Sequence, residues 1–121
     1  MIKTIRMEEV EPFLAEAKKA GLTFCNSTEY FGFYDGGELV AISGAIWYSK
    51  KATFKNSFVL ESHRHKGIYK QLFRYRMVVA RERGIKLIEA TCTEMSLPFY
   101  LKMGAKPIEQ YKLYTKVQLK I

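Results

Sequence analysis

A cluster of basic side chains stands where an apolar run of the sequence gives way to a helix-like run. The cluster comprises His63, Arg64, His65 and Lys66, and Gly67 follows it directly. A helix N-terminus already carries about half a positive charge and several unpaired N–H groups, so helices commonly place Ser, Asp or Glu there. A basic cluster forgoes that stabilisation unless an anion arrives from outside. Because glycine also lets the backbone approach a ligand, these residues predict a phosphate-binding loop with charge-assisted contacts from Arg64 and Lys66.

The elements that would position this loop follow from hydrophobic spacing and turn residues. We expect strands near residues 2–6, 52–62, 86–92 and 111–121, a hairpin turning at 35–37, and helices over 7–20, 67–83 and 95–103. The order β-α-β-β-β-α-β-α-β-β predicts an α/β fold whose mixed sheet carries helices on both faces, in a single domain over residues 1–121. A right-handed crossover over 52–92 would place the loop at the carboxyl end of a strand, where such sheets bind ligands.

Two finer patterns concern the core. Helical spacing places Phe73 and Tyr75 toward the core, with Arg and Lys side chains between them in solvent. Alternation in the last segment places five side chains on one buried face, namely Leu113, Thr115, Val117, Leu119 and Ile121. Glycines are expected to end the three helices, at Gly21, Gly84 and Gly104.

The loop sequence "VLESHRHKGIYKQL" resembles the acyl-CoA pyrophosphate loop of the GNAT acyltransferase superfamily, V-x-P-x-x-R/Q-x-x-G-x-G/A. Val59, Arg64 and Gly67 match this pattern, whereas Glu61 stands where Pro is common and Tyr69 replaces a small residue. The resemblance implies a GNAT-like, mostly antiparallel sheet and acetyl-CoA as co-substrate. It implies cofactor contacts from Phe58, Val59, Leu60, Arg64, His65, Lys66, Gly67, Ile68, Tyr69, Lys70 and Thr93.

A second segment, "TEMSLPFYLKMGAKPI", resembles the superfamily's N-x-x-A-x-x-x-Y-x-K-x-G-F segment. Tyr100, Lys102 and Gly104 fall in register, and Thr93 stands at the Asn position. By this resemblance Tyr100 lies near the CoA sulfur and protonates the leaving thiolate, while Thr93 helps to hold the pantetheine arm. A phenol with a pKa near 10 suits that proton transfer.

Transfer of an acyl group from a thioester to an amine also needs a polarised carbonyl and a neutral amine. By resemblance, a backbone N–H around Leu60 polarises the carbonyl. The first candidate for the general base is Glu89, and the second is Glu61. The spacing from Glu89 to Tyr100 is one residue shorter than usual in the family, so an ordinary ion-paired glutamate on the other face stays an open alternative.

Two other functions stay open at this point. Basic residues interleave with aromatic ones in "KQLFRYRMVVARERGIK", and small phage proteins of the Mom type, which modify DNA bases, are similar to GNAT enzymes. A nucleic-acid substrate would use basic residues outside the loop, such as Arg74, Arg76, Lys112 and Lys116. Alternatively, the chain is an acyl-CoA-binding regulatory module without turnover. No metal is expected, because His63 and His65 have no clustered Cys or further His beside them.

Composition narrows the class of protein further. The 20 Lys and Arg against 12 Asp and Glu give a net charge of +8, which favours anionic partners such as a phosphorylated cofactor. Cys25 and Cys92 lie far apart outside any CxxC pattern, so reduced thiols and a cytoplasmic location are expected. No apolar run is long enough for a membrane span. We expect a monomer or homodimer that acts on a small-molecule or peptide amine.

Overall fold

The computed structural model describes residues 1–19 and 27–121 and contains three α-helices and one short 3-10 helix. The strands are β1 (Ile2–Ile5), β2 (Glu29–Asp35), β3 (Glu38–Trp47), β4 (Lys51–Val59), β5 (Leu87–Cys92), β6 (Lys106–Gln110) and β7 (Thr115–Lys120). The helices are α1 (Met7–Lys19), η1 (Glu61–His63), α2 (Ile68–Glu82) and α3 (Leu97–Lys102). The predicted order of elements is therefore confirmed.

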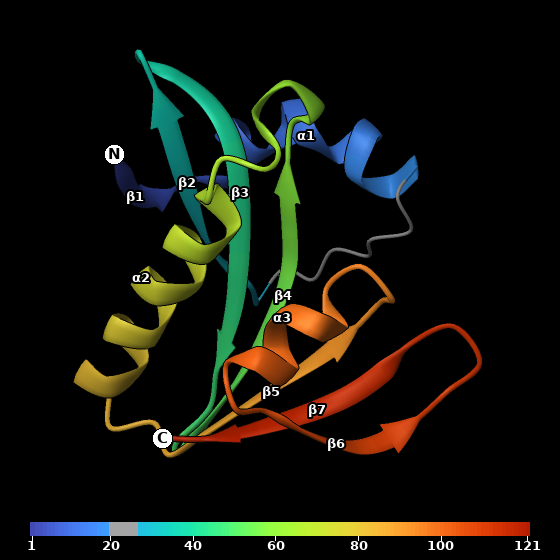
Figure 1. Ribbon diagram of the computed structural model, residues 1–121. Coiled ribbons are helices and arrows are strands. Elements are labelled where there is room, and N and C mark those ends of the chain that lie inside the picture. Colours follow the sequence, from blue (N-terminus) through green and yellow to red (C-terminus); the bar gives the residue numbers. More distant parts are fainter. Residues whose placement is uncertain (20–26) are drawn as a thin grey trace.

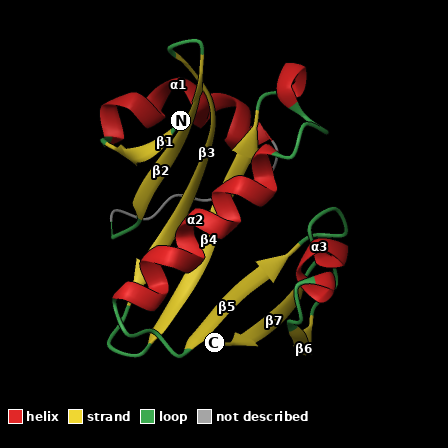
Figure 2. Ribbon diagram, turned by 60° about the vertical axis from the view of Figure 1, so that its left-hand side comes forward, coloured by secondary structure: helices red, strands yellow, loops and turns green. Residues whose placement is uncertain are grey.

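All seven strands form one sheet in the order β1-β2-β3-β4-β5-β7-β6. Neighbouring strands are antiparallel, except that β4 and β5 are parallel and joined by the α2 crossover. Helices α1 and α2 lie on opposite faces of the sheet (Figures 1 and 2). The mixed, mostly antiparallel α/β fold predicted from the sequence is confirmed.

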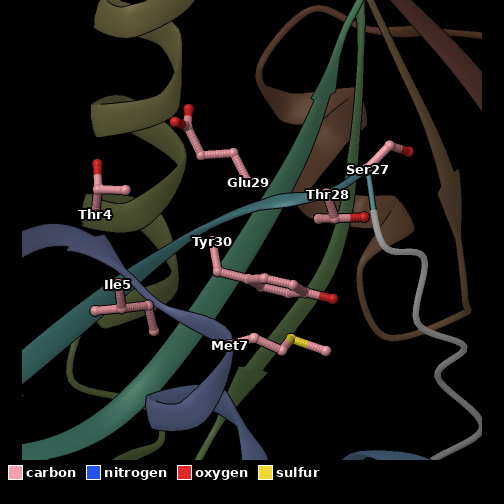
Figure 3. Close-up of a pocket in the computed structure, with 7 residues that line it drawn as sticks. All are labelled: Thr4, Ile5, Met7, Ser27, Thr28, Glu29 and Tyr30. Atoms are coloured by element: carbon pink, nitrogen blue, oxygen red, sulfur yellow. The ribbon is translucent and has the colours of Figure 1, made fainter.

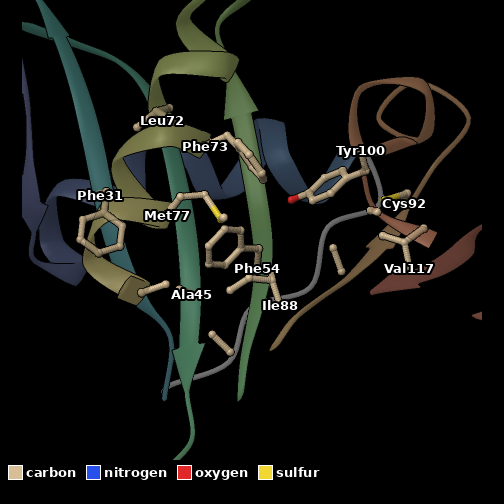
Figure 4. Packing of buried hydrophobic residues seen from close by; sticks show 14 of the residues in the cluster. Phe31, Ala45, Phe54, Leu72, Phe73, Met77, Ile88, Cys92, Tyr100 and Val117 are labelled. Carbon is tan, nitrogen blue, oxygen red and sulfur yellow. The ribbon is translucent and has the colours of Figure 1, made fainter. Parts of the chain in front are cut away.

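Each face of the sheet has its own core. Under α1, the buried side chains are Ile5, Val10, Phe13, Tyr30, Ile42 and Phe58. On the other face α2 buries Leu72, Phe73, Met77 and Ala80 against the sheet, and this larger cluster extends to Tyr100 on α3 (Figure 4). Fully burying a side chain such as Leu72 contributes about 2 kcal/mol, so the two faces hold the helices firmly. The prediction that Phe73 and Tyr75 face the core is confirmed, since Tyr75 packs against Phe31 with ring centroids 5.4 Å apart.

Local signals explain several boundaries. The β2–β3 hairpin turns at Gly36 and Gly37, whose φ angles of 59° and 86° suit glycine. Helix α1 carries Glu8 and Glu9 in its first turn and lysines in its last turn, as the macrodipole favours. Its predicted cap, Gly21, and the predicted thiol Cys25 lie outside the described residues.

One predicted strand was too long. The tail forms β7 only from Thr115, because the chain first turns back from β6, and Tyr111 N–H donates to Tyr114 O across that turn. Leu113 therefore lies in the turn with 76% of its surface exposed, and its predicted place on the buried face was wrong. Thr115 and Val117 are buried as expected.

Candidate active site

Strands β4 and β5 separate part-way along their length. Their parallel ladder runs from Lys51 paired with Leu87 to Phe54 paired with Ala90, whereas β4 continues to Val59. Figures 1 and 2 show the two strands diverging beyond this ladder. Asn56, with φ of 57°, forms a bulge where the register of β4 against β3 shifts. The end of β4 is therefore not paired with β5, and its backbone groups on that side form no ladder with a neighbouring strand.

The backbone groups at this end of β4 are oriented by β3. Leu60 N–H donates to Val40 O at 2.9 Å, so the N–H expected to polarise a carbonyl already has a partner. Because neighbouring residues of an antiparallel strand direct their N–H groups to opposite sides, the Val59 N–H points toward the side that β5 has left. Arg64 Nε donates to Val59 O at 2.9 Å on the same side of the strand. Of the two N–H groups, that of Val59 rather than that of Leu60 therefore points away from β3.

The predicted phosphate loop connects β4 to α2 through the short η1 helix. His65 and Gly67 both adopt left-handed conformations, with φ of 63° and 79°, and a Cβ added to Gly67 would meet nothing within 4 Å. Gly67 is the N-cap of α2, where no side chain caps the helix and no acidic residue occupies the first turn. The first N–H groups of α2, beginning at Ile68, therefore face outward without an intrahelical acceptor.

The side chains of the loop divide into exposed and anchored groups. Arg64, His65 and Lys66 are exposed. His63 is anchored, because its Nε2 lies 3.0 Å from Asp35 Oδ2 and its Nδ1 lies 2.8 Å from Ser62 Oγ. The loop is thus tied to the β2–β3 hairpin at one point, while its cations remain accessible to an anion.

Tyr100 lies on α3 and is only 3% exposed. Its ring packs edge-on against Phe73 and Phe99, with centroids 5.5 Å and 5.8 Å away, and Figure 4 shows it extending toward α2. Burial raises the pKa of Tyr100, whereas the nearby Arg76 charge and the Tyr69 hydroxyl act to lower it. The hydroxyl is therefore a proton donor at neutral pH.

Arg76 is the residue of this site that sequence analysis misplaced. It was expected on the surface, but its side chain is completely buried, and NH2 donates to Ser57 Oγ on the unpaired part of β4. Arg76 also lies near enough to Tyr100 for its charge to lower the pKa of that hydroxyl. A signal was present in the sequence, since Arg76 stands four residues from both Leu72 and Ala80, on the buried stripe of α2.

Tyr69 and Thr93 complete the predicted cofactor residues. Tyr69 packs against Phe99 with ring centroids 5.0 Å apart, and burial raises its pKa. Its side chain thus fills the space between the start of α2 and α3. Thr93 is exposed and follows β5 directly, with its N–H bonded to Ser96 Oγ at 3.1 Å and its carbonyl to Leu97 N–H at 3.0 Å. The Thr93 side chain is not used in these contacts.

Comparison with known proteins identifies the family and the fold of the chain. A family model described as the acetyltransferase (GNAT) family matches residues 2–105. The chain belongs to this family. A search of curated protein sequences found no match.

Solved structures of this family share the fold at low sequence identity. The chain is similar to an IAA acetyltransferase from Bacillus cereus, at 17% identity and a TM-score of 0.79, over 100% of this chain and 99% of the other. It is similar to the ribosomal-protein-S18-alanine N-acetyltransferase from Escherichia coli, at 12% identity and a TM-score of 0.77, over 100% and 93%. It is also similar to the PaiA N-acetyltransferase from Thermoplasma acidophilum in complex with coenzyme A. The identity is 16% and the TM-score 0.73, over 97% of this chain and 80% of the other.

In this GNAT chain, the structure does not bring Glu89 and Tyr100 together. The neighbours of Glu89 on β5, Ile88 and Ala90, belong to the same core cluster as Tyr100, so alternation directs Glu89 to the opposite face. There its carboxylate lies 2.7 Å from Lys51 Nζ and 3.4 Å from Lys116 Nζ. Gln118 Nε2 also donates to it at 3.1 Å. The contacts with Lys51 and Gln118, chiefly, lower the pKa of Glu89 to about 2, which makes it a weak base.

Glu89→Gln should therefore reduce stability while changing turnover less than about threefold. We expect a loss of about 1–2 kcal/mol at pH 7, because charge-assisted hydrogen bonds become neutral ones. Since the folded pKa lies below the ordinary value, the wild type has this advantage above pH 4.5 and loses it as the pH falls toward 2. Urea unfolding of both proteins across this range would test it, with Glu38→Gln as an exposed control. A large loss of turnover at unchanged stability would instead make Glu89 the base.

Other features of the described residues lie apart from this site. A hollow of about 580 Å³ is lined by Thr4, Ile5, Met7, Ser27, Thr28, Glu29 and Tyr30 (Figure 3). It contributes no residue to the phosphate loop or to the surroundings of Tyr100. Within residues 1–19 and 27–121, no group of three His, Cys, Asp or Glu side chains could hold a metal ion. No helix in the same ranges is long and apolar enough to cross a membrane.

Proposed function

We propose that the chain is an acetyl-CoA-dependent N-acyltransferase that transfers an acyl group to a primary amine by direct attack. Membership of the GNAT family supports the class of reaction. The observation that carries the proposal is the proximity of three features: the end of β4 that β5 does not pair, the uncapped start of α2, and Tyr100, whose ring packs against Phe73 of α2. The first feature offers a donor for the thioester carbonyl, the second a site for the cofactor's pyrophosphate, and the third a proton for the leaving thiolate.

The residues of the site suit acetyl-CoA in order along its length. The pyrophosphate would be held by N–H groups of Ile68, Tyr69 and Lys70 and by the exposed side chains of Arg64, His65 and Lys66. The pantetheine arm would run along the open side of β4, past Phe58, Val59 and Leu60, with Thr93 on the other side. In this arrangement the Val59 N–H would donate to the thioester carbonyl oxygen.

The transfer then needs a single proton donor from the chain. The amine nitrogen attacks the carbonyl carbon, the C–N bond forms, and the C–S bond breaks with its electron pair on sulfur. Tyr100 gives its proton to that thiolate as general acid. We leave the removal of the amine proton to solvent rather than to Glu89, whose charge is engaged by Lys51 and Gln118 on the opposite face.

A nucleic-acid substrate receives less support from the structure. Of the basic residues expected to contact phosphates outside the loop, Arg76 is buried and Lys116 lies 3.4 Å from the Glu89 carboxylate. Arg74 and Lys112 are exposed. We therefore propose a small-molecule or peptide amine as the acceptor.

The proposed function predicts two measurable events. Isothermal titration should detect binding of CoA and acetyl-CoA. Free thiol should then appear when acetyl-CoA is mixed with an acceptor from a panel comprising a polyamine, a lysine-containing peptide, a peptide with a free N-terminal alanine, and free amino acids. No binding at millimolar CoA would refute the proposal, whereas binding without thiol release from any acceptor would favour a regulatory acyl-CoA-binding module. Retention of duplex DNA at low salt, with CoA saturating, would favour the nucleic-acid substrate instead.

A further inference from the structure

Arg76 is a charged side chain in an apolar core. It has no solvent exposure, and its guanidinium lies 4.3 Å from the centroid of the Phe54 ring. NH1 donates to Gly44 O at 2.9 Å and NH2 to Ser57 Oγ at 3.2 Å, while Nε has no hydrogen-bond partner among the described residues. The hydrogen bonds that it makes in the core are thus to neutral oxygens and leave part of its capacity unused.

No carboxylate in residues 1–19 or 27–121 forms an ion pair with Arg76. Removing an unpaired charge from water costs several kcal/mol, so a core position occupied by arginine is unfavourable for stability alone. Arg76 shares one face of α2 with Phe73, whose ring centroid lies 5.9 Å from that of Phe54 and 5.5 Å from that of Tyr100. The titratable groups around this cluster are Tyr69 on α2, Tyr100 on α3 and Cys92 on β5. All three are neutral acids, and each would become an anion on losing its proton.

Among these groups, Tyr100 is the one that the proposed reaction deprotonates. When its proton passes to the sulfur of the leaving thiolate, a phenolate is left in a site shielded from water. A phenolate buried without a cation would be as unfavourable as the unpaired guanidinium. The Arg76 guanidinium and the Tyr100 phenolate therefore compensate each other's charge only during proton transfer. Such an interaction stabilises the transition state rather than the resting enzyme.

We propose that Arg76 is a positioning residue of the acyl-transfer site, which orients the Tyr100 hydroxyl and stabilises the phenolate formed when Tyr100 protonates the leaving thiolate. This inference rests on the proposed function. The C–S bond breaks with its electrons on sulfur, and the Tyr100 proton forms the S–H bond. The attacking amine loses its proton to solvent, and a proton from solvent restores the phenol after the thiol has formed.

The test is a double-mutant cycle on Arg76 and Tyr100, with acetyl-CoA and the fastest acceptor of the amine panel. Arg76→Gln removes the charge but keeps an amide donor for Gly44 O, and Arg76→Lys keeps the charge. We expect Arg76→Gln to lower kcat about 10²-fold with little change in KM for acetyl-CoA. In the Tyr100→Phe background the same substitution should change kcat less than about threefold, because no phenolate forms there. Arg76→Lys should recover part of the loss.

A second readout does not depend on turnover. Tyrosinate absorbance is measured against pH in proteins with Tyr100 and with Tyr100→Phe. The difference between the two curves reports the ionisation of Tyr100. Without the neighbouring cation, Tyr100 should ionise at higher pH, and Arg76→Lys should lie between Arg76→Gln and the wild type. If Arg76→Gln is too unstable to purify, the pH at which Tyr100 ionises must still differ between Arg76→Lys and the wild type.

The outcomes separate the two proposals. Equal losses of kcat in the Tyr100 and Tyr100→Phe backgrounds, or an unmoved Tyr100 titration, would show that Arg76 only braces α2 against β3 and β4 and would overturn the inference. A wild-type protein that releases no thiol with any acceptor would refute the proposed function itself. A coupled loss of kcat with unchanged CoA affinity supports the role of Arg76.

Discussion

CoA should raise the melting temperature of the wild-type protein and leave that of Gly67→Asp unchanged. A ligand at a hundredfold excess over its Kd stabilises the folded state by about 2.7 kcal/mol, which corresponds to a rise of about 10 °C for a domain of this size. Gly67 lies at the uncapped start of α2, with open space beyond its α-carbon. An aspartate there would put a side chain and a negative charge where the pyrophosphate is proposed to bind.

A matched control separates this effect from backbone strain. Gly84 ends α2 with φ of 75°, and a Cβ there also meets nothing within 4 Å, so Gly84→Asp imposes a similar cost of about 1 kcal/mol. Gly84→Asp should lower the melting temperature but keep the full shift with CoA. Gly67→Asn, which adds the side chain without the charge, should retain part of the shift. A normal CoA shift in Gly67→Asp would place the phosphate site elsewhere.

Tyr100→Phe should lower kcat by about 10²–10⁴-fold with nearly unchanged affinity for CoA. The substitution removes one hydroxyl and little volume, so the ring contacts with Phe73 and Phe99 persist. Because burial raises the pKa of Tyr100 above 10, this group stays protonated through the neutral range. As a general acid it would limit the rate only when the pH rises above that value. Steady-state kinetics and titration calorimetry on the same preparations would measure both effects.

Tyr30→Phe provides the matched control for this change. Tyr30 is as buried as Tyr100, at 3% exposure, but its hydroxyl accepts a hydrogen bond from Asn56 Nδ2 at 2.9 Å in the core under α1. Its removal should cost about 1 kcal/mol of stability and leave kcat unchanged. If Tyr100→Phe behaves like Tyr30→Phe, the thiolate leaves without help from Tyr100.

Local sequence signals account for most of the architecture. The Asp35-Gly36-Gly37 hairpin, the charges at the ends of α1, and the glycines at 67 and 84 act within a few residues of their own positions. The crossover from β4 through α2 to β5 follows from element order and chirality. The segments that carry Arg64, Gly67 and Tyr100 were therefore predictable without knowledge of long-range contacts.

The environment of individual side chains depended on contacts between distant segments. The partners of Glu89 come from β4 and β7, and the Leu60 N–H donates to Val40 O on β3. Both sets of contacts depend on the register between strands. Arg76 is buried because α2 packs against β3 and β4, where Gly44 O on β3 and Ser57 Oγ on β4 accept its hydrogen bonds. The sequence by itself determined the order of elements and the phosphate loop, because helix ends, turns and periodicity are local properties. Only the tertiary structure decided which side chains are charged, paired or available for chemistry, because burial and pairing arise when remote segments meet.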